Sequence, residues 1–311
     1  MASSAPQGMP LPLTHLDQAI GFTIPARHAR GRVVRLGPVL DAILANHNYP
    51  APLDRVLGEA LVLTALLGAT LKDAAGQLTL QAQAEGGSVD LLVCDYRNGE
   101  LRGYLRHDPE RIVGLEDRPS LQALFGTGYL AITFDQAVSG ERYQGIVPLE
   151  GASLADAVQH FFAQSEQIPS LVRVAFESRG TAGHVAGGIL LQHLPEGEEG
   201  RERLHTRLDH PEWAHVEVLG STIRPAELVD EALSLDGIVW RLFNEEDEVR
   251  VLATTAFNKG CRCSPAHIRS VLARFPAGER AEMADEHGVI VVNCEFCARS
   301  MQIELASITD R

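Results

Sequence analysis

The first third of the chain changes from helical to alternating spacing of its apolar residues. Between Leu53 and Leu67 the apolar positions recur mostly three or four residues apart and cover most sides of a helix. A helix that is apolar on most sides packs inside a domain, so this pattern predicts a long buried helix. From residue 77 to 83 the sequence QLTLQAQ alternates apolar and polar residues, which is typical of a β-strand.

Similar patterns predict a mixture of antiparallel strands and helices up to residue 194. Asn98-Gly99 indicates a hairpin between strands at 88–96 and 101–105, because a type I′ turn needs positive φ at both central residues. An amphipathic helix is predicted from Ser153, as N-cap, to Gln164. We therefore expect an α+β fold with a mixed α/β N-terminal domain at 13–194, preceded by a flexible tail at 1–12. The other predicted elements are strands at 30–35, 129–134, 142–148 and 171–176 and a helix at 38–46.

The composition changes near Pro195. Residues 196–217 contain seven acidic and three basic residues with few large apolar groups. Helical spacing then returns beyond Pro225, a residue type suited to the first position of a helix. These features predict a helical linker at 195–250 with little core of its own, resting on its neighbours. Trp213 and Trp240 are expected to dock this linker by burial.

Overall composition narrows the function classes. The 311 residues are 45% hydrophobic and 22% charged, which is ordinary for a folded protein of two or three units. The net charge of -14 argues against a broad nucleic-acid surface, because phosphates require clustered Lys and Arg. The N-terminus has no Lys or Arg before Arg27 and no apolar h-region, and the most apolar run, 60–69, is about half a membrane span. A cytoplasmic protein with no membrane partner is expected.

Four of the five cysteines lie within 37 residues, as Cys261-x-Cys263, thirty further residues, and Cys294-x-x-Cys297. Two close pairs separated by a helix-sized insert predict a metal site. Soft thiolates without a companion carboxylate favour zinc, and a closed set of four sulfurs leaves no position for a hydrolytic water. We therefore expect a zinc-binding domain at 251–311 that holds one zinc ion in the reduced protein, and no enzymatic activity.

The cysteine set leaves more than one role open. Structural zinc without regulation is the commoner role for four cysteines, and the spacing does not match the common iron–sulfur runs. Two features favour a redox role: Cys-x-Cys is less usual in a structural zinc site, and zinc-bound thiolates can react with oxidants. Zinc would join the two pairs across the insert. If each pair closed on itself, the disulfides would link only neighbours, stabilising by roughly 2 kcal/mol each against roughly 4 for a link across the insert.

Other potentially reactive residues receive simpler interpretations. Cys94 lies in a predicted strand and is expected to be a buried, inert thiol. Two histidines lie between the cysteine pairs but are not needed as ligands: His267 and His287. The linker histidines are expected on the surface: His205, His210 and His215. The basic residues near the cysteines either offset the charge of a zinc tetrathiolate or are solvated: Lys259, Arg262 and Arg299. No P-loop, dinucleotide fingerprint or nucleophile elbow is present, so an ATP-driven machine is not indicated.

Beyond single residues, several short sequence runs resemble, in the same order, those of the redox-regulated 33 kDa chaperonin family. Members of that family are bacterial holdases. The resemblance extends over nearly the whole chain and includes the order and spacing of Cys261, Cys263, Cys294 and Cys297. The matching runs elsewhere are NHNYP at 46–50, GERYQG at 140–145, SEQIP at 165–169 and VWRLF at 239–243.

This resemblance implies an ATP-independent chaperone that oxidation activates. In the reduced, zinc-bound state the protein would be folded and largely inactive. Peroxide or hypochlorite would form Cys261–Cys263 and Cys294–Cys297 disulfides, expel zinc and unfold the zinc domain and the linker. The exposed apolar surface would bind unfolded client proteins. The resemblance also implies a homodimer in the active state and transfer of clients to ATP-dependent foldase chaperones.

Two other classes remain as alternatives. A zinc-stabilised nucleic-acid-binding protein is disfavoured by charge, since residues 256–311 contain seven basic and seven acidic residues with no basic stripe. A thiol oxidoreductase could use Cys294 and Cys297, but such a motif usually opens a helix beside a βαβ pattern. No such pattern is apparent in this part of the sequence.

Overall fold

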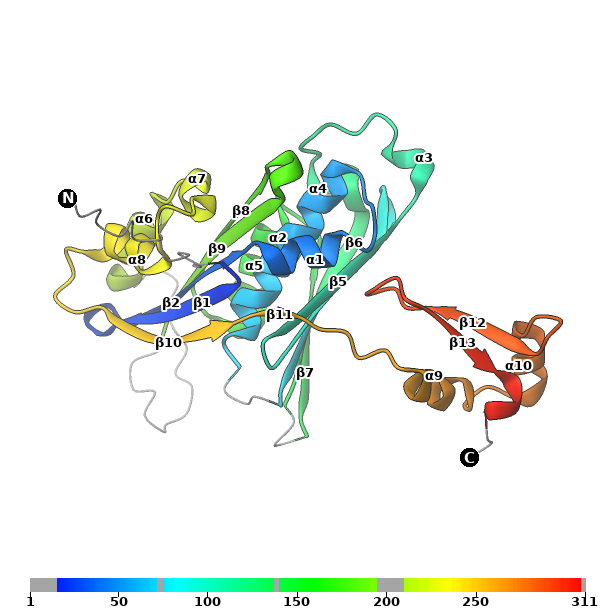
Figure 1. The fold of residues 1–311 in the computed structure, drawn as a ribbon. Helices are drawn as coiled ribbons and strands as arrows, with labels where there is room; N and C mark the ends of the chain where they lie inside the picture. The colour runs from blue at the N-terminus through cyan, green and yellow to red at the C-terminus, as the bar shows by residue number, and fades with distance from the viewer. Residues whose placement is uncertain (1–15, 72–74, 137–139, 195–209, 309–311) are drawn as a thin grey trace, which may run out of the picture.

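Two sheets form the frame of the molecule, shown in Figure 1. A computed structural model describes residues 16–71, 75–136, 140–194 and 210–308, so the tail predicted at 1–12 lies outside the described residues. The first sheet is antiparallel throughout and has the strand order β10-β1-β2-β9-β8. Its strands are β1 (Gln18–Ile24), β2 (Ala29–Leu36), β8 (Ser170–Ser178), β9 (His184–His193) and β10 (Arg250–Ala256).

The second sheet has the order β11-β5-β4-β3-β6-β7, and only β11 pairs in parallel. The predicted Asn98-Gly99 hairpin joins β4 to β5, with φ of 50° at Asn98 and 80° at Gly99. The strands are β3 (Gln77–Gly86), β4 (Val89–Arg97), β5 (Glu100–His107), β6 (Gly126–Asp135), β7 (Arg142–Pro148) and β11 (Asn258–Lys259).

The predicted buried helix, α2 (Ala51–Gly68), packs against strands of both sheets. Contact on two sides explains why its sequence is apolar almost all round. Ser153 caps α5 (Leu154–Phe161) in a capping box with Asp156, and a π-helical turn at Phe162–Glu166 follows. The α+β fold class is confirmed. The remaining elements of this part are α1 (Pro38–Leu44), α3 (Pro109–Ile112), α4 (Leu121–Phe125) and 3-10 turns at Pro25–Arg27 and Gly180–Ala182.

The described part of the linker forms α6 (Pro211–Ser221), α7 (Pro225–Val229) and α8 (Leu235–Phe243) on the outer face of the first sheet (Figure 1). Its apolar residues share a second hydrophobic cluster with that sheet. Trp213 is 3% exposed, as predicted. The prediction for Trp240 was wrong, because it is 69% exposed. Ile238, Val239 and Leu242 form the buried face of α8, so Trp240 projects from the opposite side.

Arginines of the N-terminal domain hold the linker through polar contacts. Arg35 of β2 is fully buried and donates hydrogen bonds to the carbonyl oxygens of Leu228 at 2.9 Å and Leu233 at 2.8 Å. Arg27 forms an ion pair with Glu246, its Nε lying 2.9 Å from a carboxylate oxygen. These bonds satisfy carbonyl and carboxylate groups of the linker where it meets the first sheet.

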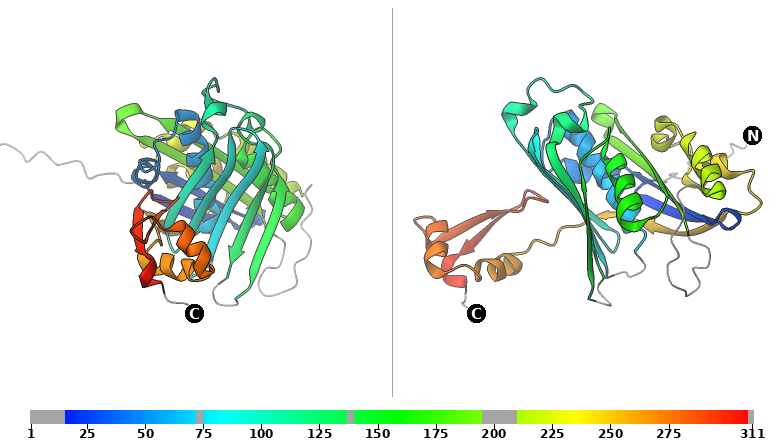
Figure 2. Two further views of the ribbon diagram at one scale, coloured as in Figure 1. Left: turned by 90° about the vertical axis from the view of Figure 1, so that its right-hand side faces the viewer. Right: turned by 180° about the vertical axis from the view of Figure 1, so that it is seen from behind.

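The C-terminal unit, residues 261–308, lies beside the outer side of the second sheet, away from the linker (Figures 1 and 2). Its buried apolar cluster is small and consists of Leu272, Ile290, Ile303 and Ile308. No helix among the described residues is long and apolar enough to cross a membrane. The unit contains α9 (Pro265–Leu272), α10 (Ala277–Met283), the hairpin of β12 (Val289–Asn293) and β13 (Ser300–Glu304), and a 3-10 turn at Leu305–Ser307.

Candidate metal centre

The four clustered cysteines meet at one point of the C-terminal unit. Their Sγ atoms all lie within 4.8 Å of one another. The Sγ of Cys261 is 3.3 Å from that of Cys263 and 3.6 Å from that of Cys294, while Cys263 and Cys297 are 3.5 Å apart. A tetrahedral site with zinc–sulfur bonds of about 2.3 Å has sulfur–sulfur edges of about 3.8 Å. The cysteines can therefore hold a metal ion after small movements, and their chemistry suits a soft or borderline cation.

Different local structures present the two pairs. Cys261 and Cys263 lie between β11 and α9, where the Gly260 amide donates to the Leu101 carbonyl at 2.9 Å and Ser264 caps the helix. Cys294 and Cys297 lie in the turn between β12 and β13. No helix begins at this second pair, so the structural context of a thiol oxidoreductase is missing from this described turn.

Hydrogen bonds around the second pair explain its tight turn. The Cys294 amide donates to the Arg299 carbonyl at 3.0 Å, and the Ala298 amide donates back to the Cys294 carbonyl at 2.8 Å. Ala298 has a φ of 53°, in the left-handed region that non-glycine residues rarely adopt. The turn thus directs both thiols of this pair toward the first pair.

Electrostatics within the cluster favour one thiolate in the absence of a cation. Burial raises the pKa of Cys261, but hydrogen bonds from the Cys263 backbone and the other thiols outweigh it and give a pKa of about 7. Burial, together with hydrogen bonding to Cys261, raises the pKa of Cys263, and burial also raises the pKa of Cys294. A bound cation favours deprotonation of every coordinating thiol, so these sulfurs suit a metal better than isolated reactivity.

An aromatic side chain between Cys294 and Cys297 docks the centre on the second sheet. The Phe296 ring lies 3.9 Å from the guanidinium carbon of Arg102 and meets the Tyr104 ring edge-on at 4.9 Å between centroids. Both partners come from β5. Sequence reasoning overlooked Phe296, although an aromatic residue between two metal-ligand positions is itself a sign of a contact.

The basic residues near the cysteines also contact the N-terminal domain. Lys259 donates to the Ala42 carbonyl at 2.7 Å, and Arg262 donates to the Gln77 side chain at 2.5 Å. They therefore help to fix the segment that carries the first cysteine pair. Arg299 is exposed, in agreement with a solvated charge.

The other candidate residues take structural roles. Cys94 is fully buried, and burial raises the pKa of its thiol, so it is confirmed as a buried, weakly reactive cysteine. His267 and His287 are not part of the described cysteine cluster. His215 is exposed and pairs with Glu246, whereas His210 caps α6; His205 lies outside the described residues.

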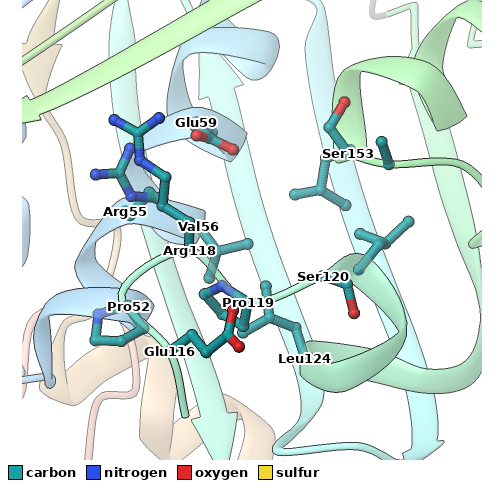
Figure 3. A pocket seen from close by; sticks show the side chains of 13 residues that line it. Pro52, Arg55, Val56, Glu59, Glu116, Arg118, Pro119, Ser120, Leu124 and Ser153 are labelled. Carbon is teal, nitrogen blue, oxygen red and sulfur yellow. The ribbon is translucent and has the colours of Figure 1, made fainter.

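A separate cavity of about 390 Å³ opens between α2, the loop before α4 and the start of α5, as Figure 3 shows. Arg55, Glu59, Arg118 and Ser153 line it, without any of the cysteines. Burial raises the pKa of Glu59 to about 7 despite the opposing charges of Arg55 and Arg118.

Comparison with known proteins decides the family. A family model described as "Hsp33 protein" matches residues 17–304, which include both sheets, the linker and all four clustered cysteines. The chain belongs to the Hsp33 family. The family is one of chaperones and not of enzymes, in agreement with the sequence prediction.

Individual Hsp33 relatives match over nearly their whole length. A "33 kDa chaperonin" of Caulobacter vibrioides (strain NA1000 / CB15N) is 41% identical over 295 residues, 93% of this chain and 95% of the relative. One of Yersinia pestis (strain Pestoides F) is 35% identical over 290 residues, 91% of each chain. The crystal structure of the Thermotoga maritima 33 kDa chaperonin has a TM-score of 0.77 at 20% identity, covering 94% of this chain and 97% of its own. It shows a shared fold.

Proposed function

We propose that this Hsp33 family member is an ATP-independent holdase whose zinc site is an oxidation switch. In the reduced protein Cys261, Cys263, Cys294 and Cys297 would bind one zinc ion. The convergence of two sequence-distant pairs within 4.8 Å is the observation that carries the proposal. The chain would function as a chaperone core at 13–194, a linker at 195–250 and a redox-switch domain at 251–311.

The C-terminal unit depends on the cysteine centre for its fold. Zinc, when bound, would connect the two cysteine pairs directly. Among the described residues, the hydrophobic cluster of the unit has four buried members, Leu272, Ile290, Ile303 and Ile308, with only partly buried apolar residues packed around them. A core of this size does not hold a unit of some fifty residues firmly by itself.

Oxidation would replace this connection by local links. Cys261 would pair with Cys263 and Cys294 with Cys297. Each pair of zinc-bound thiolates would give two electrons to one peroxide or hypochlorite, which takes up protons from solvent and leaves as water, with chloride in the case of hypochlorite. The sulfurs of Cys261 and Cys263 are already 3.3 Å apart. Sulfur atoms joined in a disulfide are no longer thiolates and do not bind zinc, so zinc would leave. Neither disulfide ties one half of the unit to the other, and the unit would unfold.

The segment 250–260, named the strap here, would transmit this change to the linker. It runs from the region after α8 to Cys261 and lies along both sheets, through β10 and β11. The C-terminal unit and the linker lie on opposite sides of the sheets (Figure 1). Unfolding at Cys261 would release one end of the strap and then the helices that precede it. Apolar side chains of the first sheet, including Phe22 and Val33, would become available to unfolded clients.

Family membership supports the remaining features of the proposal. The active protein would be a homodimer, would act in the cytoplasm, and would pass clients to ATP-dependent foldase chaperones after reduction. Nucleic acid would not be a partner, because the net charge is -14.

The decisive experiment follows zinc, thiols and chaperone activity in one sample. Peroxide with mild heat should release one zinc per chain, remove four free thiols and start suppression of client aggregation. A reductant with added zinc should reverse all three changes. Equal suppression of aggregation in both redox states, or activation with zinc retained, would refute the switch.

A further inference from the structure

The strap completes the edges of both sheets through its backbone. β10 pairs antiparallel with β1 in a register that places Gln18 opposite Ala256, and β11 pairs in parallel with β5. The Phe257 amide donates to the Asp17 carbonyl at 2.7 Å, and the Asn258 amide donates to the Gly99 carbonyl at 2.9 Å. One extended segment therefore supplies the outermost strand of each sheet.

Few side chains of the strap contribute to this contact. Val251 is 55% exposed and Leu252 is 48% exposed, and the other β10 side chains also face solvent to a large extent. Phe257 is 3% exposed and belongs to the main core, where its ring meets the Tyr96 ring edge-on at 6.2 Å. Main-chain hydrogen bonds, one buried aromatic ring and the hydrogen bond from the Lys259 side chain to the Ala42 carbonyl hold the strap in place.

Removal of the strap would leave the β1 edge unpaired, together with Glu100 and Leu101 at the start of β5, and an apolar cavity where Phe257 had been. Unpaired edges offer rows of N–H and C=O groups to other extended chains. Recognition by strand addition takes its affinity from the main chain and its selectivity from pockets for single side chains. The strap is held in the same manner, by main-chain hydrogen bonds along β10 and by the buried pocket of Phe257.

We propose that the edge formed by β1 and the first two residues of β5 binds extended segments of unfolded client proteins, and that the strap blocks this edge in the reduced protein. This inference rests on the proposed function, which provides for the release of the strap. The occupant is a stretch of polypeptide without hydrogen-bonded structure that carries an aromatic or large apolar residue for the Phe257 position. Folded proteins lack such stretches, because their own secondary structure satisfies the backbone groups.

The outward direction of the β10 side chains bears on client selectivity. A segment in the place of β10 would keep most of its side chains in solvent, so their identity would matter little. Only the Phe257 position requires an apolar group. A proline at a donating position would be excluded, because it has no N–H. Such a site accepts many sequences, which a holdase for diverse clients requires.

Hydrogen exchange on the full-length protein tests the proposal directly. The probe client is a reduced and carboxymethylated globular protein, which cannot refold. Oxidation should expose the amides of residues 250–260 and those of β1 that face β10. Client binding should protect the β1 amides again while residues 250–260 remain exposed. Protection of 250–260 in the oxidised, client-loaded protein would overturn the proposal, as would β1 amides that stay exposed.

A labelled peptide with the sequence of residues 249–260 provides a second test. It should bind the oxidised protein, compete with the client and bind the reduced protein at least about tenfold more weakly. A peptide methylated at the Phe257, Asn258 and Gly260 nitrogens keeps every side chain but loses the donors, and should bind at least about tenfold more weakly. Equal binding of both peptides would show that backbone pairing is not the mode of recognition.

Failure of the edge-binding proposal is distinguishable from failure of the proposed holdase function. The oxidised sample is first checked for suppression of client aggregation. An active sample that protects no β1 amides refutes the edge site alone, whereas an inactive oxidised sample refutes the proposed function. The variant Phe257→Ala weakens the docked strap within its own chain and should increase peptide affinity for the reduced protein, where the strap still covers the edge; unchanged affinity would count against blocking by the strap.

Discussion

Truncation of one buried aromatic residue in α8 should activate the protein without oxidation. Phe243 is 1% exposed, and its ring centroid lies 5.7 Å from that of Phe22 on β1. Trp240, three residues earlier on the same helix, is 69% exposed. Phe243→Ala therefore removes a contact between the linker and the first sheet, while Trp240→Ala removes an aromatic ring of the same helix without such a contact.

The magnitude follows from burial. Replacing a fully buried Phe by Ala destabilises a structure by about 3–5 kcal/mol. Applied to the docking of the linker, this shifts the equilibrium toward the detached state by roughly 100- to 5,000-fold. The helices α6, α7 and α8 are short and share their apolar cluster with the sheet, so they have little to offset such a loss. Trp240→Ala should change docking by about 0.5 kcal/mol or less.

The assay uses both variants in the reduced, zinc-bound state. Amide exchange across 211–243 should accelerate strongly in Phe243→Ala, and this variant should suppress client aggregation with its zinc retained. Trp240→Ala should match the unaltered protein in both measurements. Identical behaviour of the two variants would refute docking by burial. A Phe243→Ala protein with a detached linker and no chaperone activity would refute the role of the covered surface.

Three further predictions concern separate parts of the molecule. Because burial raises the pKa of Glu59 to about 7 from 4.5, the folded state binds a proton more tightly, and stability should fall as pH rises from about 4.5 to 7. Glu59→Gln should therefore raise the melting temperature at pH 8 but not at pH 4.5, and the free energy of unfolding at pH 8 should rise by at most about 3 kcal/mol. An equal rise at both pH values would show that ionisation of Glu59 is not the cause. Chelation of zinc from the reduced protein should remove exchange protection from 261–304 while β3 and β4 keep theirs, and full protection of the chelated unit would contradict its dependence on metal. Cys94→Ala should leave peroxide activation unchanged, measured by aggregation suppression, because the thiol is fully buried; a loss of activation would show that Cys94 participates.

Local signals identified much of the N-terminal domain. The apolar sides of α2 predicted a buried helix, since the helix contacts both sheets. Asn98-Gly99 predicted its hairpin, because few residue pairs adopt positive φ at two successive positions. The spacing of the cysteines predicted their cluster for a similar reason, as metal ligation restricts which short spacings are useful.

Features that depend on distant contacts escaped prediction. β9 is buried along almost its whole length, so its sequence does not alternate, and it was not identified as a strand. The side of α8 that carries Trp240 was misjudged because aromatic character alone does not reveal which face of a short helix meets the sheet. Phe296 and the strap acquire their meaning only from β5 and β1, which lie far away in the sequence.

The distribution of hydrophobic contacts is consistent with the proposed function, in which one part of the molecule unfolds while another binds clients. The main core combines α2 with both sheets and includes Phe257 as the single residue of the strap. The linker relies on the first sheet for its cluster, and the C-terminal unit has only a small cluster of its own. Local opening requires less free energy where fewer apolar groups are buried. Under the proposed function, loss of the cysteine centre would affect the C-terminal unit first, the strap and linker next, and the α2-centred core last, which would leave a folded platform for the exposed surface.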